Sequence, residues 1–144
     1  MFSKACKYGI KAMIYLALHS AEGSYCSLTD ISANIDSPLA FTSKVLQQLA
    51  KNKLIVSLKG VNGGFRIETK KLSKINLLHI VKIIDGESLL YDCGLGLKMC
   101  SDTKPCPIHK QYSLIREEIR KMLENTSVID FSANKKKQVL ILLR

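Results

Sequence analysis

The sequence predicts a mainly α-helical protein with a small β-hairpin wing, in which a winged helix-turn-helix domain precedes a long C-terminal helix. Apolar residues recur at helical spacing in several segments. A β-prone segment leads into the glycine-rich turn KGVNGG, and three cysteines cluster in a segment whose glycines and prolines favour a loop. The expected regions are a winged helix-turn-helix domain at 1–85, a cysteine-rich loop at 86–109, and a long helix with a C-terminal tail at 110–144.

Composition indicates one basic globular domain. The chain has 144 residues and 47% hydrophobic content, which suffices for one core but not for a second large domain. Its net charge of +10 attracts polyanions such as nucleic acids, although a basic protein need not bind them. Five cysteines without paired spacing favour a reducing compartment, so we expect a cytoplasmic protein. The apolar run Ala12–Leu18 is far shorter than the ~20 residues of a membrane span, so no membrane association is expected.

The first part of the chain carries start signals for three helices. Residues 3–21 show helical spacing of apolar side chains. Ser27 and Asp30 resemble a capping box and begin a short second helix. Ser37–Pro38 begins a third helix over 38–52, with Ser37 as the cap and an outer face of polar and basic residues. Two short helices joined by a tight turn predict a helix-turn-helix, although other helical hairpins look similar.

A β-hairpin is expected directly after these helices. Residues 54–58 and 65–67 are β-prone, and the turn between them is rich in glycine, which permits positive φ. Lys59 and Arg66 are placed to meet phosphates. This order of elements predicts a winged helix-turn-helix that binds double-stranded DNA. An ordinary solvated hairpin and an RNA-binding winged helix are the alternatives.

Two more helices are expected, one on each side of the cysteine loop. The first covers 76–85, and His79 within it is interpreted as structural. The apolar stripe of the second has spacings of four and three residues and consists of Ile108, Tyr112, Ile115, Ile119 and Met122. Such a helix on a small domain needs a partner surface, so we expect a homodimer through this stripe. Packing within the chain is the alternative, and one helix can serve both purposes.

The segment CGLGLKMCSDTKPCPIH is the strongest candidate site. Cys93, Cys100, Cys106 and His109 follow the spacing C-x6-C-x5-C-x2-H, and thiolate and imidazole are ligands of iron–sulfur clusters and of zinc. Zinc modules usually pair their ligands at shorter spacing. A metal-free thiol switch and a loop without a ligand are further alternatives. Because no nucleophile–base motif, phosphate loop or carboxylate pair is evident, no enzymatic activity is expected.

The segments LTDIS, KVLQQLAKNKLIVSLKG and NGGF, together with the cysteine loop, resemble the IscR and NsrR type of bacterial winged-helix regulators, in the Rrf family. The likeness covers roughly residues 1–126. It implies a homodimer that binds near-palindromic promoter DNA, with recognition helices in the major grooves and wings in the minor grooves. It also implies a [2Fe–2S] or [4Fe–4S] iron–sulfur cluster, with [2Fe–2S] favoured, on Cys93, Cys100 and Cys106. Such a regulator, expected to be a repressor, would sense cluster supply, nitric oxide or redox state.

The resemblance also gives roles to individual positions. His109 occupies the place of the histidine that completes the IscR-like site, and the absence of Asp and Glu from residues 1–21 favours it over an acidic ligand from the partner's first helix. The wing departs from the family, because Lys59 replaces an arginine and cannot make its bidentate contacts. From the residues themselves we expect base or groove contacts from Thr42, Ser43, Lys44 and Gln47, phosphate contacts from Ser27, Thr29, Lys51, Lys59 and Arg66, and a DNA contact from Asn62 in the wing.

Overall fold

The computed structural model describes residues 1–19 and 23–131, so the expected end of the first helix and the tail from residue 132 onward lie outside the described residues. The α-helices are α1 (Lys4–His19), α2 (Leu28–Asn34), α3 (Leu39–Lys51), α4 (Leu77–Ile84), α5 (Ser88–Tyr91) and α6 (His109–Asn125). The strands β1 (Val56–Leu58) and β2 (Gly64–Arg66) form the wing, and η2 (Thr69–Lys71) and η3 (Val128–Phe131) are short 3-10 helices. None of the described helices has both the length and the apolarity to cross a membrane.

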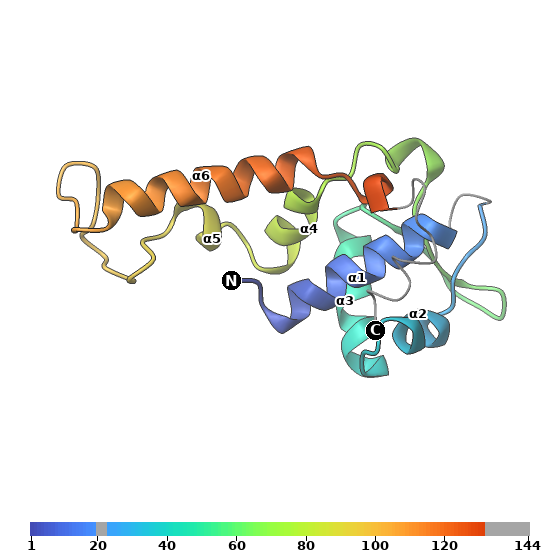
Figure 1. The fold of residues 1–144 in the computed structure, drawn as a ribbon. Helices are drawn as coiled ribbons and strands as arrows, with labels where there is room; N and C mark the ends of the chain where they lie inside the picture. The colour runs from blue at the N-terminus through green and yellow to red at the C-terminus, as the bar shows by residue number, and fades with distance from the viewer. Residues whose placement is uncertain (20–22, 132–144) are drawn as a thin grey trace.

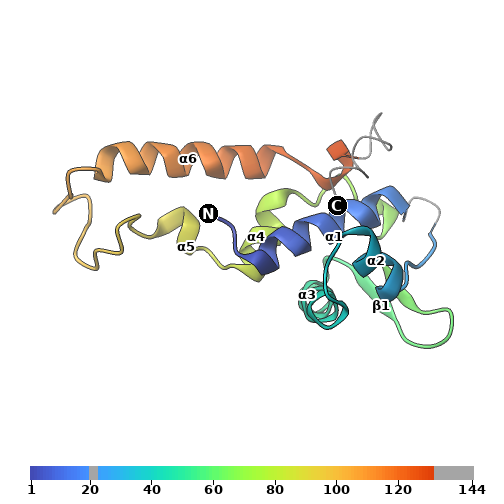
Figure 2. The ribbon, with the colours of Figure 1, turned by 60° about the horizontal axis from the view of Figure 1, so that its bottom comes forward.

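Helix α1 is the centre of the main hydrophobic core, and α2, α3 and α4 pack around it (Figures 1 and 2). The largest fully buried side chains of this core come from every one of these helices and include Met13, Leu16, Ile31, Leu46, Leu49 and Ile80. Gly9 makes the close packing possible, because a Cβ at this position would collide with Ile84 of α4. The core therefore fixes α3 firmly against α1 and α4.

The starts of α2 and α3 differ in how well they follow the sequence signals. Ser27 caps α2 as predicted, since its Oγ accepts a hydrogen bond from the Asp30 backbone N–H at 3.0 Å. Helix α3 begins one residue later than predicted, with Pro38 rather than Ser37 at the N-cap. Pro38 has an extended ψ of 135°, so it cannot be the first helical residue. The predicted cap at Ser37 is therefore wrong, and its hydroxyl is buried without a hydrogen-bond partner among the described residues.

The wing is anchored to the start of α2. Strands β1 and β2 are antiparallel, with Ser57 opposite Phe65. The backbones of Cys26 and Phe65 also exchange two hydrogen bonds of 2.9 Å, which adds a third short extended segment. Gly64 permits this approach, because a Cβ there would collide with the Cys26 carbonyl. The hairpin thus has a fixed position relative to the helix-turn-helix.

After α4 the chain leaves the main core as an arm made of α5, the cysteine loop and α6, which we define as residues 86–125 (Figure 1). The arm is joined to the rest of the molecule by a smaller hydrophobic cluster. In this cluster, Leu90 and Leu123 of the arm pack on Leu78 and Val81 of α4. The chain then returns to the main core, where Val128 of η3 is fully buried. We call residues 1–85 together with 126–131 the body. Helix α5 was not predicted.

The start of α4 explains its histidine. The Asn76 side chain accepts a hydrogen bond from the His79 backbone N–H at 3.1 Å, and the His79 ring nitrogen Nδ1 accepts one from the Asn76 backbone N–H at 3.2 Å. These reciprocal bonds form a capping box in which histidine takes the position usual for Glu or Gln. The interpretation of His79 as a structural residue is confirmed.

Candidate functional site

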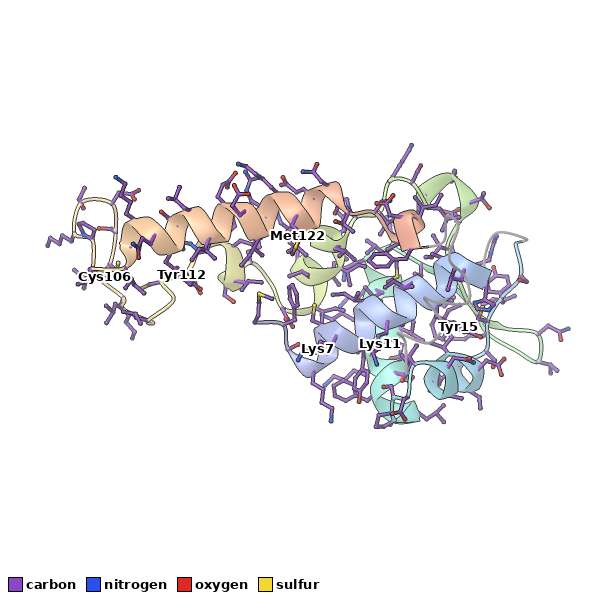
Figure 3. All side chains as sticks on the ribbon, viewed as in Figure 1. Lys7, Lys11, Tyr15, Cys106, Tyr112 and Met122 are labelled. Atoms are coloured by element: carbon purple, nitrogen blue, oxygen red, sulfur yellow. The ribbon has the colours of Figure 1, made fainter. Side chains whose placement is uncertain are left out.

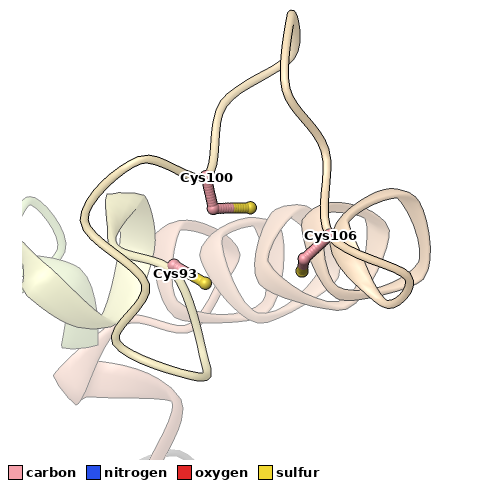
Figure 4. A group of neighbouring side chains, drawn as sticks. All are labelled: Cys93, Cys100 and Cys106. Carbon is pink, nitrogen blue, oxygen red and sulfur yellow. The ribbon is translucent and has the colours of Figure 1, made fainter.

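Three cysteine side chains converge at the far end of the arm (Figure 4). Cys93 follows α5, Cys106 precedes α6, and Cys100 lies between them in the loop. Their Sγ atoms all lie within 4.8 Å of one another, and each cysteine is partly buried. The fold therefore brings together the three predicted thiol ligands. In contrast, Cys6 and Cys26 are buried in the body.

His109 lies at one edge of this group of sulfurs. It is the first residue of α6, and its Nδ1 atom is 3.1 Å from the Cys100 Sγ. Its other ring nitrogen, Nε2, is 2.9 Å from the carboxylate of Asp102. The ring thus faces the Cys100 thiol on one side and a carboxylate on the other. Sequence reasoning singled out His109 but missed Asp102, which the loop folds back against the ring.

The loop is held closed by backbone turns. The Gly96 N–H donates to the Cys93 carbonyl at 2.9 Å, and the His109 N–H donates to the Cys106 carbonyl at 3.0 Å. Gly94 lies against the ring of Tyr112, where a Cβ would collide with the aromatic carbons. These contacts fix both ends of the loop relative to the first turn of α6.

Arg116 of α6 ties the start of the loop to the helix. Its guanidinium donates hydrogen bonds to the backbone carbonyls of Tyr91 and Asp92, the second at 2.7 Å, and lies over the ring of Tyr112 with its Cζ 5.4 Å from the ring centre. Sequence reasoning missed Arg116, because nothing in its spacing separates it from the other charged residues of an amphipathic helix. Its partners are carbonyls that only the folded arm brings into reach.

The thiols of the loop differ in acidity. The backbone amides of Leu97 and Leu95 lower the pKa of the Cys93 thiol below its usual value, because they stabilise the thiolate. At Cys100 the backbone amide of Cys106 acts in the same direction, but burial and the neighbouring thiols raise the pKa of Cys100 by more. Cys93 is therefore more readily ionised than Cys100. The ionised form, the thiolate, is the form of cysteine that binds metals and acts as a nucleophile.

The donor set fits a metal centre. Three thiolates and an imidazole nitrogen suit both zinc and an iron–sulfur cluster. A single tetrahedral zinc with bonds of about 2.3 Å would hold its sulfurs about 3.8 Å apart. The spacing of the three sulfurs, at most 4.8 Å, allows this arrangement. A [2Fe–2S] cluster carries two of its four ligands on each iron atom, and a [4Fe–4S] cluster carries one on each, so some of the sulfurs would have to lie farther apart to hold either cluster.

The outer face of α3 is formed by Ala40, Lys44, Gln47 and Lys51, whose spacing of four, three and four residues puts them on one side of the helix. All four are exposed. Ser43 lies beside them, and its Oγ accepts a hydrogen bond from the Gln47 side-chain amide at 3.1 Å. Ala40 was not among the predicted contacts, although its position four residues before Lys44 places it on this face.

Thr42 does not belong to this face, so its prediction as a DNA contact is wrong. Its side chain is only 1% exposed and lies among the core residues of α3. The Thr42 hydroxyl donates to the Pro38 carbonyl at 3.1 Å. The reason is helical phase, because Thr42 precedes the buried Val45 and Leu46 by three and four residues.

The wing and α2 present the remaining predicted DNA contacts. Lys59 and Asn62 are exposed in the turn of the hairpin. Arg66 is partly buried at its base, with its guanidinium 5.0 Å from the centre of the Tyr25 ring. At α2, Thr29 is exposed, whereas the Ser27 hydroxyl is engaged with Asp30 at 2.6 Å. Arg66 and Ser27 therefore make contacts within the chain, in addition to the DNA contacts predicted for them.

The apolar stripe of α6 divides into two edges. Tyr112 packs on the loop, and Ile119 packs on the cluster at the joint between arm and body. Ile108, Ile115 and Met122 are exposed, with half or more of the Ile115 and Met122 side chains accessible. Figure 3 shows Tyr112 near the start and Met122 near the end of the helix. One edge thus completes the arm, and the other lies open to solvent.

Comparison with known proteins identifies the family. The model of the Rrf2 family, described as an iron-dependent transcriptional regulator, matches residues 2–134. The chain belongs to the Rrf2 family. A regulator from Serratia proteamaculans named IscR is 29% identical over 128 residues, which cover 89% of this chain and 76% of the relative. The expected resemblance is confirmed, and the Rrf2 proteins it resembles are regulators of transcription rather than enzymes.

Solved structures confirm the fold class. CymR (YrzC), the global cysteine regulator of B. subtilis, has a TM-score of 0.77 at 20% identity, over 92% of this chain and 96% of that one. The IscR of T. potens has a TM-score of 0.71 at 20% identity, over 96% and 90%. The chain therefore has the winged-helix fold of Rrf2 proteins.

Proposed function

We propose that this Rrf2 protein is a cytoplasmic, homodimeric repressor whose affinity for promoter DNA depends on an iron–sulfur cluster held by the arm. The observation that supports this most is the convergence of the Cys93, Cys100 and Cys106 side chains, in a chain whose family is described as iron-dependent. His109, next to Cys100, would be the fourth ligand. A bound cluster supplies a redox-active centre, and cluster supply, nitric oxide or redox state would be the signal.

The body would read DNA through α3 and the wing. Lys44 and Gln47 are exposed on the outer face of α3, where a recognition helix meets base edges in the major groove. Lys59, at the turn of the wing, would meet phosphates beside the groove. Acidic residues are scarce in the N-terminal part of the chain, where only Glu22, Asp30 and Asp36 precede Glu68. The resulting positive field favours a polyanionic partner.

The arm would couple the cluster to DNA binding through α6. Arg116 and Tyr112 join this helix to the loop, and the exposed Ile108, Ile115 and Met122 would meet a second copy of the chain. A change in the loop would then change how two bodies are oriented relative to each other. Paired recognition helices must match half-sites about one helical turn apart, so a shift of a few Å alters affinity.

A structural zinc or a thiol switch is the second candidate for the same loop. The short separation of the sulfurs favours it, because a single tetrahedral ion needs about 3.8 Å between them. In this case the chain would still bind DNA, but the signal would be zinc loss or disulfide formation.

Anaerobic purification distinguishes these candidates. The absorbance spectrum and the iron, sulfide and zinc contents would be measured for the wild type, for Cys100→Ser and for the matched control Cys26→Ser, which alters a cysteine of the body. We expect iron and sulfide in the wild type and the control, and neither in Cys100→Ser. Zinc without iron would favour the structural ion, and metal-free protein that resists reconstitution would favour the thiol switch.

DNA binding is tested separately by the salt dependence of promoter affinity. Lys59→Ala should weaken binding to every duplex and reduce the slope of log affinity against log salt by about 1, because one phosphate contact is lost. Lys98→Ala, which removes an exposed lysine from the arm, should leave the slope unchanged. Equal affinities of cluster-loaded and cluster-free protein for all promoters would contradict the sensing role.

A further inference from the structure

The His109 ring is held at both nitrogens, which distinguishes it from a surface histidine. Nδ1 is 3.1 Å from the Cys100 Sγ, and Nε2 is 2.9 Å from the Asp102 carboxylate. The histidine side chain is 17% exposed, whereas that of Asp102 is fully exposed. The ring is therefore mostly enclosed, and its Nε2 atom meets a carboxylate that is itself exposed.

Asp102 is brought to this position by a tight turn in the loop. The backbones of Ser101 and Lys104 exchange hydrogen bonds of 3.1 and 3.3 Å, and the Ser101 Oγ accepts a further bond from the Lys104 N–H at 3.2 Å. His109 is fixed independently on the first turn of α6, where its N–H donates to the Cys106 carbonyl. The contact thus links the part of the loop between Cys100 and Cys106 to the helix.

The hydrogen-bond chemistry of this contact determines which ring nitrogen faces the thiols as a ligand. An ionised carboxylate only accepts hydrogen bonds, so Nε2 must carry the proton that it donates to Asp102. In the neutral ring, Nδ1 then has a free lone pair on the side of the Cys100 sulfur. Carboxylates that accept from the second nitrogen of a metal-binding histidine fix both its tautomer and its orientation.

We propose that Asp102 is a positioning residue that holds His109 so that Nδ1, and not Nε2, is the ligand atom. This inference rests on the proposed binding of metal by the arm and adds to it the ligating atom and the residue that selects it. Asp102 itself touches no metal in this arrangement. Its loss would leave the ring free to turn about its Cβ–Cγ bond and to offer either nitrogen.

Cadmium is a suitable probe, because it prefers thiolate and imidazole ligands and the isotope ¹¹³Cd couples to ligand protons. Ligation through Nδ1 places only the Hε1 proton three bonds from the metal, whereas ligation through Nε2 places both Hδ2 and Hε1 at this distance. Reduced full-length protein would be titrated with ¹¹³Cd²⁺ alone. We expect coupling to the Hε1 of His109 without coupling to its Hδ2.

The variants test the role of Asp102. Asp102→Ala should lower Cd²⁺ affinity 10- to 100-fold, as is usual when the carboxylate behind a ligating histidine is lost. Asp102→Glu should restore much of it, and Asp92→Ala, which removes a carboxylate from the start of the same loop, should have no effect. Unchanged thermal unfolding of metal-free Asp102→Ala would show that the variant is folded.

Two results would overturn the inference while leaving the metal site intact. One is coupling to Hδ2 in the wild type, and the other is equal Cd²⁺ affinity in the wild type and Asp102→Ala. A wild-type chain that bound no Cd²⁺ would overturn the proposed metal site and the role of Asp102 together.

Discussion

The body and the arm are stabilised in different ways. In the body, α1 is buried along most of its length, and the core includes side chains from α1 to α4, from β2 and from η3. In the arm, Leu90 and Leu123 are the only hydrophobic side chains with less than a tenth of their surface exposed among the described residues. Leu95, Leu97 and Met99 of the cysteine loop are largely exposed. The body is therefore stabilised mainly by burial of apolar side chains, whereas the arm gains little stability from burial.

This difference identifies the arm as the region whose order a bound ligand could change most. Burial of apolar surface is the main stabilising contribution to a fold, so a segment with little of it depends on other contacts for its order. In the arm these are the Arg116 hydrogen bonds and the turns around the cysteines, together with the proposed metal at the thiols. A ligand at the thiols can change the arm without disturbing the body.

The largest expected effect is on the free energy of unfolding, and it compares a buried side chain of the body with an exposed side chain of the arm. Leu46→Ala in α3 removes a side chain with no exposed surface and should lower the free energy of unfolding by about 2–5 kcal/mol. Leu114→Ala removes a side chain of α6 that is 62% exposed and should cost about 0.5 kcal/mol or less. Urea unfolding of reduced, metal-free protein measures both. Equal losses would show that Leu114 is packed as tightly as Leu46, against its exposure in the structure.

The next effect concerns pH and a thiol of the body. Burial, followed by the nearby Asp85 carboxylate, raises the pKa of Cys6 from its usual 9.0 to about 12. The unfolded chain releases this proton above pH 9, while the folded chain keeps it until about pH 12. The free energy of unfolding should therefore fall between these values by up to about 1.4 kcal/mol per pH unit.

Unfolding of the wild type and of Cys6→Ala between about pH 8 and 10.5 tests this prediction. Groups other than Cys6 titrate in both proteins, so their contributions cancel in the difference. The difference in unfolding free energy should be constant below pH 9 and should change in favour of the variant above it. A difference that stays constant over the whole range would show that the Cys6 thiol ionises equally in the folded and unfolded chains.

The third effect concerns the exposed edge of α6. Ile115 is 55% exposed and contributes little to the packing of its own chain, so Ile115→Glu should leave the folded monomer intact. A charge in the proposed dimer interface should weaken self-association at least tenfold, or about 1.4 kcal/mol. Lys110→Glu introduces the same side chain on the opposite face of the helix and should remain dimeric. Sedimentation or light scattering would measure the mass, and an unaltered dimer would rule out this edge as the interface.

Much of the fold could be predicted because it depends on local signals. The Ser27 cap, the glycines of the wing and the period of the apolar residues each act within a few residues of the chain. The cysteine spacing likewise indicated which thiols would meet. Tertiary contacts gave no such signal, so the attachment of Arg116 to the Tyr91 and Asp92 carbonyls was missed.

The errors at α3 have a different cause. Polarity alone placed Thr42 on the outer face, whereas the phase set by Val45, Leu46 and Leu49 places it inside. Threonine can be buried there because its hydroxyl bonds to the Pro38 carbonyl within the helix. The same phase places Ala40 on the outer face, although its methyl group suggests the core.

The smallest expected effect tests this assignment directly. Thr42→Val keeps the shape of the side chain and removes the hydrogen bond to Pro38, so it should cost about 1 kcal/mol of stability or less and leave the preferred DNA sequence unchanged. Gln47→Ala, on the exposed face, should leave stability within about 0.5 kcal/mol and change which bases are preferred, since a base contact discriminates by about 1–3 kcal/mol. Selection of binding sites from a randomised duplex library measures both variants. An altered preference in Thr42→Val with none in Gln47→Ala would mean that the helix meets DNA with its other face.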